Sequence, residues 1–160
     1  MEVRARGQGP REIHHSGGVP AASTAPSWYN PGAVGLTFVT VEVANVNEPE
    51  QAASVECLVD SGAVHSVIPR VVLESLGIKP YTRDEYSLAN GELVKRERGA
   101  ALFKYAGRMG FADVIFGEEG DASLLGAVTL EAMGLALDPF RRELKPMPMV
   151  LGGWPRRGAE

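Results

Sequence analysis

The alternation of apolar and polar positions predicts a mainly β chain whose regular structure begins near residue 35. Val39, Val41 and Val43 alternate with polar residues, which is the period of a strand with one buried face. A second apolar run predicts another strand over residues 54–59. The residues between these two runs, Asn45–Ala53, are typical of a turn region.

A tight turn is predicted in the middle of the chain. Asn90-Gly91 stands between two strand-like stretches, residues 86–89 and 92–94. Because both turn residues tolerate positive φ, this dipeptide predicts a β-hairpin of the type I′ kind.

The second half of the chain continues with strands. Residues 100–105 and 111–116 predict two of them, joined around Gly107. Residues 122–126 form a last apolar run, which we expect to be buried.

Two short helices are predicted from proline and glycine positions. Pro69 opens an apolar segment, residues 70–76, and Gly77 follows it, which is the usual asymmetry of a short helix. A second helix is predicted over residues 128–133, with Gly134 just past its end.

These elements together predict a mainly β fold, a small closed barrel or sandwich with two short helices. The segment Leu73–Ile78 is similar to Leu130–Leu135, and each follows an apolar run that ends in Gly-Ala. Two strand–turn–helix halves would explain this internal similarity.

Composition and charge narrow the possible partners. The chain has 160 residues, of which 44% are apolar, so one domain with its own core is expected. Its net charge is −4, which disfavours nucleic acid and acidic membranes as partners because both are bound through dense Lys/Arg patches. The basic cluster Lys95–Arg98 is interrupted by Glu97, and we expect it on a solvated strand face.

Cysteine content and the chain ends favour a cytoplasmic protein. Cys57 is the single cysteine and lies in an apolar run, so we expect a buried structural thiol and no intramolecular disulfide. No secretory leader or membrane span is recognisable. We expect residues 1–33, rich in Gly, Pro, Ser and Ala, to be a disordered extension, residues 34–146 to be the folded domain, and residues 147–160 to be a tail.

The strand over residues 54–59 ends on a carboxylate, Asp60, and the chain then turns through Ser61-Gly62-Ala63. A charged group at the end of a buried strand is costly unless it is paired or hydrogen-bonded. One interpretation is local, since Asp commonly accepts hydrogen bonds from backbone amides of the turn that follows it. A functional interpretation stays open beside it.

Other kinds of site fit poorly. Ser61 is not in a G-x-S-x-G elbow, because Val59 stands where the first glycine belongs. Cys57, Asp60 and His65 would make an incomplete metal site, and a strand splays such ligands apart. We therefore expect neither a metal nor a cofactor, and we expect His65 to be an exposed loop residue. We expect the acidic pair Glu118-Glu119 to be part of a turn.

Asp60-Ser61-Gly62-Ala63 after an apolar strand resembles the signature of retroviral-type (retropepsin-like) aspartic proteases. About sixty residues later, an apolar-apolar-Gly motif precedes a short helix, as in the second half of that family: Leu124, Leu125 and Gly126. The hairpin of Ala89, Asn90 and Gly91 falls where the family carries its flap. The resemblance covers roughly residues 35–146. Two departures are Ser61, where most members have Thr, and a flap tip with one glycine.

The resemblance implies a closed barrel and an aspartic endopeptidase built as a homodimer. Asp60 would be the catalytic acid, and Ser61, Gly62 and Ala63 would support its loop. Ala89, Asn90 and Gly91 would close over an extended peptide substrate, and Leu124, Leu125 and Gly126 would pack behind the catalytic loop. Since the chain contains a single Asp-Ser-Gly, two copies would be needed to supply two acids. The alternative is a dimeric protein-interaction module of the same fold without turnover.

Overall fold

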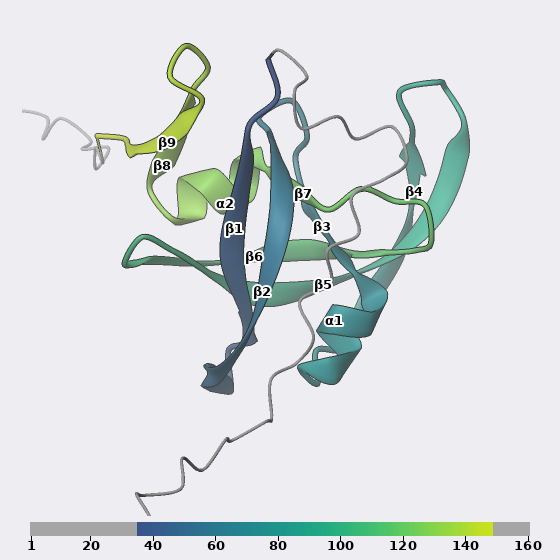
Figure 1. The fold of residues 1–160 in the computed structure, drawn as a ribbon. Coiled ribbons are helices and arrows are strands. Elements are labelled where there is room, and N and C mark those ends of the chain that lie inside the picture. The colour runs from purple at the N-terminus through teal and green to yellow at the C-terminus, as the bar shows by residue number, and fades with distance from the viewer. Residues whose placement is uncertain (1–34, 149–160) are drawn as a thin grey trace, which may run out of the picture.

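The computed structural model describes residues 35–148, and the chain over this range is mainly β with two short helices (Figure 1). The extension expected over residues 1–33, and the predicted tail beyond Pro148, lie outside the described residues. The elements in chain order are β1 (Phe38–Asn45), β2 (Glu48–Asp60), β3 (Ser66–Pro69), α1 (Arg70–Ser75), β4 (Thr82–Ser87), β5 (Leu93–Tyr105), β6 (Arg108–Gly117), β7 (Leu124–Gly126), α2 (Ala127–Ala132), β8 (Leu135–Asp138) and β9 (Glu143–Pro146).

Seven of the strands form one sheet that closes on itself. Their order is β1-β2-β7-β3-β6-β5-β4, and β1 also pairs with β5, so the ring from β1 to β5 has no free end. The closing pairs join Glu42 to Lys104, Val43 to Phe103 and Ala44 to Leu102. The predicted mainly β barrel is therefore confirmed, and β4 is left as an outer strand paired to β5.

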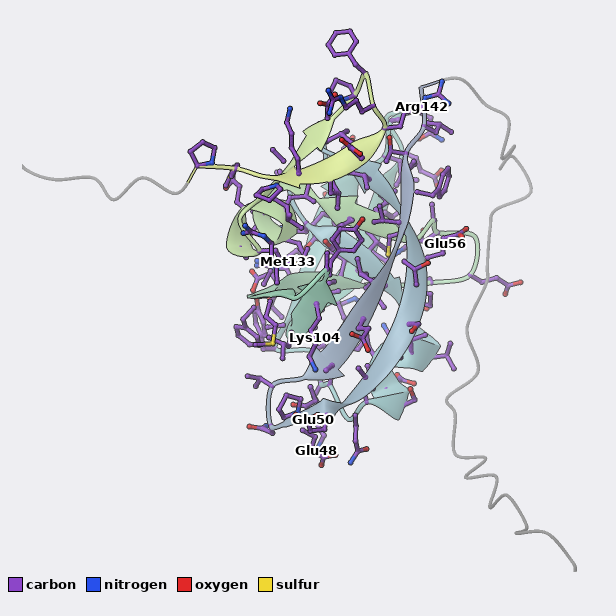
Figure 2. The ribbon with its side chains drawn as sticks, turned by 60° about the vertical axis from the view of Figure 1, so that its left-hand side comes forward. Glu48, Glu50, Glu56, Lys104, Met133 and Arg142 are labelled. Carbon is purple, nitrogen blue, oxygen red and sulfur yellow. The ribbon has the colours of Figure 1, made fainter. Side chains whose placement is uncertain are left out.

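The β1–β2 hairpin is longer than predicted. Asn45–Ala53 was expected to be a turn region, but β2 already begins at Glu48, and the turn is held by Asn45 Oδ1, which accepts the amide of Asn47 at 3.0 Å. The polar residues there are strand residues with exposed side chains, which is why their composition suggested a turn. Figure 2 shows Lys104 beside this end of the hairpin, where its ammonium donates to the Pro49 carbonyl.

Both predicted helices are present within one residue of their expected bounds. Pro69 precedes α1 with φ −53°, and Gly77 follows it at φ +69°. Gly134 follows α2 in the same left-handed conformation, at φ +66°. The amides of Gly77 and Gly134 donate to the carbonyls of Glu74 and Glu131, so the similar sequence segments do end in similar turns.

The core fills the barrel between these elements. The largest fully buried side chains come from six strands and both helices, and they include Phe103, Phe116, Ile68, Leu73 and Leu125. The β8–β9 hairpin forms a separate two-stranded sheet after α2. Among the described residues there is no helix with the length and apolar character that crossing a membrane requires.

Candidate active site

The carboxylate of Asp60 lies where β2 ends and the chain turns sharply. Its Oδ1 accepts the amide of Gly62 at 2.9 Å, and its backbone carbonyl accepts the amide of Ala63 at 3.1 Å. A Cβ on Gly62 would lie 3.2 Å from Oδ1, so glycine lets the backbone come close to the acid. The side chain thus caps the turn with one oxygen, and Oδ2 has no hydrogen-bond partner among residues 35–148.

The loop that carries Asp60, residues 60–65, is supported from behind by β7. This short strand runs parallel to β2, with Gly126 opposite Asp60, and antiparallel to β3. A Cβ on Gly126 would lie 2.6 Å from the backbone of His65, so the close approach requires glycine. Leu125 is fully buried, and Leu124 faces a cavity described below.

The same loop is hydrogen-bonded to the start of α2. The amides of Ala127 and Val128 donate to the carbonyls of Ala63 and Val64 at 2.8 and 3.2 Å. Because the first amides of a helix have no partner within it, this arrangement satisfies two of them and fixes the loop at the same time. The backbone beside Asp60 is therefore held by segments from the other half of the chain.

A set of buried hydrogen bonds joins β3, β7 and α2. The hydroxyls of Ser66 and Thr129 lie 2.6 Å apart, and Ser66 Oγ accepts the amide of Gly126 at 3.0 Å. Both side chains are fully buried, so each depends on the other for hydrogen bonding. These hydrogen bonds were not predicted from the sequence, although a serine followed by the apolar residues Val67 and Ile68 indicates a buried polar group.

The hairpin predicted at Asn90-Gly91 is present between β4 and β5, but its turn differs from the prediction. The amide of Gly91 donates to the carbonyl of Leu88, which makes Ala89 and Asn90 the central residues of the turn. Gly91 has φ +83°, whereas Asn90 is not in the positive-φ region. The type I′ prediction was therefore wrong. The turn is a three-residue loop in which only Gly91 needs the left-handed conformation, and Asn90 Oδ1 accepts the amide of Glu92 instead.

A cavity of about 490 Å³ lies between the Asp60 loop, the base of the flap hairpin and the segment before β7. Of the predicted site residues Ala63 and Leu124 line it, whereas Asp60 and the flap tip do not, among the residues described. Ser61 is exposed and lines a different cavity, of about 370 Å³, beside α2 and β8. The predicted residues are thus brought to the same end of the barrel without forming one closed pocket.

Two expectations about polar residues near this cavity were wrong. His65 was expected to be exposed, but it is half-buried at the cavity wall, and its Nδ1 has no hydrogen-bond partner among the described residues. The cluster Lys95–Arg98 was expected on a solvated face, but Arg96 and Arg98 are both in ion pairs and 18% and 24% exposed. The partner of Arg96, Asp121, lies in the loop between β6 and β7, and Asp84, a partner of Arg98, lies on the neighbouring strand β4.

No group of three or more His, Cys, Asp or Glu side chains suited to a metal ion occurs within residues 35–148. What the structure shows at Asp60 is a carboxylate held by the Gly62 amide, three residues before Ala63, which lines the cavity. Cys57 does not contribute, because it is fully buried and burial raises the pKa of its thiol to about 12.

Comparisons with known proteins assign the chain to a family. The sequence profile of the aspartyl protease family matches residues 39–128, which include β2, the Asp60 loop and β7. The solution structure of simian foamy virus (mac) protease is similar at 20% identity and a TM-score of 0.40, covering 58% of this chain and 92% of that one. No curated protein sequence matches the chain. Since the profile matches more than half of the 160 residues, the chain belongs to the aspartyl protease family.

Proposed function

We propose that the protein is an aspartic endopeptidase that hydrolyses peptide bonds with a water molecule activated between the Asp60 carboxyls of two subunits of a homodimer. The observation that carries this proposal is the position of Asp60. Strand β2 delivers its carboxylate to the end of the barrel, and the Gly62 amide orients one of its oxygens.

The chemistry requires two acids with different protonation states. The ionised carboxyl accepts a proton from the water while the water oxygen attacks the peptide carbonyl carbon. The protonated carboxyl donates its proton to the carbonyl oxygen. The tetrahedral intermediate then collapses and the C–N bond breaks. The nitrogen leaves with the proton that the first carboxyl took from the water, and the second carboxyl regains its proton from the intermediate's hydroxyl. Two carboxyls at hydrogen-bonding distance hold one proton between them, so the apparent pKa values belong to the pair.

Each chain contributes one such acid, which is why we propose a homodimer. The chain contains one Asp-Ser-Gly sequence, and the position opposite Asp60 in the second half is Gly126. Ser61 and Gly62 are exposed in the single chain and are therefore free to contact a second copy about a two-fold axis. In the dimer the Ser61 hydroxyls would hydrogen-bond between the two loops.

An extended peptide is the substrate that suits the groove. The cavity beside Ala63 is open, and the hairpin of Ala89, Asn90 and Gly91 projects from its rim with an exposed tip. A peptide lying under this flap would pair with it through backbone hydrogen bonds and place alternate side chains in the cavity.

The test is hydrolysis of a fluorescence-quenched peptide library by the wild type and by Asp60→Asn. We expect Asp60→Asn to lose turnover and remain a folded dimer, because the amide is nearly the same shape and removes the repulsion between two acids. Glu56→Gln, an exposed change on the same strand, is the matched control and should keep full activity. Wild-type activity should also fall on dilution through the dissociation constant of the dimer.

Mixing the two chains tests the shared site directly. Excess Asp60→Asn should suppress wild-type activity after subunit exchange, because a heterodimer has one acid and one amide. Activity that instead follows the number of wild-type chains linearly would mean that each subunit works alone. A dimer without any Asp60-dependent turnover would favour the non-catalytic interaction module.

A further inference from the structure

The cavity beside Ala63 has a mostly apolar wall. Its apolar lining comes from the Asp60 loop and from four strands that surround it, and it includes Val64, Val67, Val94, Ile115 and Leu124. A peptide side chain that enters this space loses its contact with water. An apolar side chain gains from that transfer, whereas a charged one needs a partner of opposite sign.

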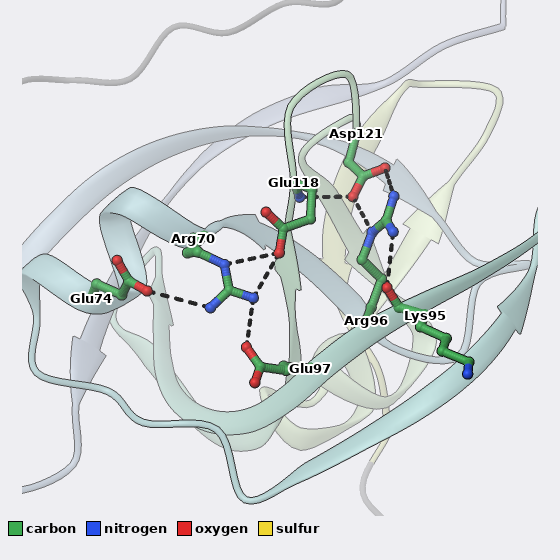
Figure 3. Close-up of polar contacts among 7 residues, drawn as sticks. All are labelled: Arg70, Glu74, Lys95, Arg96, Glu97, Glu118 and Asp121. Atoms are coloured by element: carbon green, nitrogen blue, oxygen red, sulfur yellow. Dashed lines mark hydrogen bonds and ion pairs between the residues drawn. The ribbon is translucent and has the colours of Figure 1, made fainter.

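One ion pair, Arg96–Asp121, stands in this wall. Arg96 Nε donates to Asp121 Oδ2 at 2.6 Å, and Nη2 donates to Oδ1 at 2.9 Å, so the pair is bidentate (Figure 3). Arg96 comes from β5, at the base of the flap, and Asp121 from the loop between β6 and β7. The two side chains are only 18% and 20% exposed, which places their charges largely out of solvent.

Each side chain of the pair also makes a hydrogen bond to the backbone. Arg96 Nη1 donates to the Lys95 carbonyl at 3.0 Å, and Asp121 Oδ2 accepts the Glu118 amide at 2.8 Å. Although burial alone would raise the pKa of Asp121, the hydrogen bonds from Arg96 and Glu118 outweigh it and lower that pKa. The pair is therefore ionised, and its two charges cancel at the cavity wall.

A second ion-pair cluster holds the same loop from the other side. Arg70 Nη2 lies 2.7 Å from carboxylate oxygens of both Glu97 and Glu118 (Figure 3). The Arg70 guanidinium also lies over the ring of Phe116. Glu97 is linked to this loop through Arg70, which also pairs with Glu118. The Glu118 amide donates to Asp121 Oδ2, so Asp121 has a second hydrogen-bond partner besides Arg96.

We propose that Arg96 and Asp121 are the specificity-determining residues of this cavity, and that their mutual neutralisation makes it select an uncharged, apolar side chain of the peptide. This inference rests on the proposed endopeptidase function. Removing one partner leaves a single, poorly hydrated charge in the wall, and a substrate side chain of opposite sign then becomes its best available partner. Arg96→Met should therefore turn the preference towards Lys, and Asp121→Asn should turn it towards Glu.

The experiment uses a quenched peptide that the wild type cleaves and its analogues with norleucine, Lys or Glu at each position in turn. At the peptide position whose side chain enters the cavity, the wild type should prefer norleucine over Lys and Glu. Arg96→Met should raise the Lys-to-norleucine ratio of kcat/KM there by at least about tenfold, and Asp121→Asn should raise the Glu-to-norleucine ratio similarly. The double variant Arg96→Met/Asp121→Asn has no charge left to satisfy and should restore the norleucine preference.

Arg98→Met is the matched control. Arg98 also lies on β5 and pairs with two carboxylates, those of Asp84 and Asp113, but it does not line the cavity. Its loss should lower stability without changing the order of the three peptides. If all variants keep the wild-type order, or if Arg98→Met shifts it as Arg96→Met does, the inference is overturned.

Binding separates this inference from the proposed function. In an Asp60→Asn background, dye-labelled forms of the same peptides should bind in the same order, as measured by fluorescence anisotropy at one fixed pH. A switch in binding without Asp60-dependent turnover in the parent would refute the endopeptidase and keep the specificity assignment. Binding that is absent or indifferent to the peptide charge in both single variants would refute the assignment.

Discussion

Cys57 and Asp60 lie three residues apart on β2, yet their surroundings give them opposite chemistry. Cys57 is fully buried in the core, where the thiol has a raised pKa and no access to solvent. Asp60 is half-buried at the strand end, where an amide orients it and one oxygen stays available. Successive side chains of a strand point to opposite faces, so Cys57 points into the core, whereas Asp60 lies on the other face at the end of the strand.

The raised pKa of Cys57 gives a testable pH dependence. Burial mainly, and the nearby charge of Glu56 secondly, raise this pKa from 9.0 to about 12, so the folded chain retains the thiol proton to higher pH than the unfolded chain. The associated stability is fully present below pH 9 and is lost as the pH rises towards 12. Cys57→Ala should flatten that alkaline part of the profile in urea titrations. Native protein should also resist iodoacetamide at pH 8, and labelling as fast as in urea would contradict the burial.

Single residues were predicted best where the chemistry is local. Asp60 could be singled out because a carboxylate that ends an apolar strand is unusual, and its turn-capping hydrogen bond was one of the two open interpretations. The ion pair of Arg96 and the half-buried position of His65 were missed, because the residues that surround them are distant in sequence. Lys95–Arg98 looks like any solvated charged strand until Asp121 is brought beside it.

At the scale of elements, the two hairpins of β5 offer a matched comparison. The β4–β5 turn and the β5–β6 turn each have a glycine in the left-handed region, Gly91 at φ +83° and Gly107 at φ +77°, and a Cβ on either would meet open space. The cost of a side chain at both is therefore conformational strain of about 1–2 kcal/mol and involves no steric clash.

Gly91→Val and Gly107→Val should thus lower the free energy of unfolding by similar amounts. Only Gly91→Val should reduce kcat/KM for peptide hydrolysis, because the two sides of the hairpin that carries this turn line the cavity at Leu88 and Val94 and, under the proposed function, the turn closes over the peptide. Chemical denaturation and steady-state kinetics of the two variants measure this. Equal kinetics in both would mean that the hairpin of Ala89, Asn90 and Gly91 is not the lid.

Strands and helices with a clear period or clear punctuation were predictable, and those defined by tertiary pairing were not. Helix α1 follows from Pro69 and Gly77, and β1 from the alternation around Val41. Strand β3 has only four residues, and its pairing with β6 and β7 cannot be inferred from its own sequence. The early start of β2 was missed because its first residues are exposed and polar.

At the scale of the whole molecule, closure of the barrel through β1 and β5 makes the core one unit. Phe103 pairs with Val43 across this closure and is fully buried, whereas Phe111 on the adjacent strand is 54% exposed. Phe103→Ala should therefore cost about 3–5 kcal/mol and Phe111→Ala much less, in a single cooperative urea transition. A small loss at Phe103, or two separate transitions, would show that the barrel halves unfold independently.

The insertion of β7 between β2 and β3 has a consequence for how the chain reaches its native state. Ser66 and Gly126, which hydrogen-bond across this insertion, are 60 residues apart in sequence. The loop-closure entropy of that separation must be overcome before the backbone around Asp60 is fixed, so this region belongs among the late-forming contacts of a slow, high-contact-order folding reaction. A nascent or partly folded chain would then carry the acid without its supporting strand. Under the proposed function, the ability to cut other proteins would arise only after synthesis of the barrel is complete.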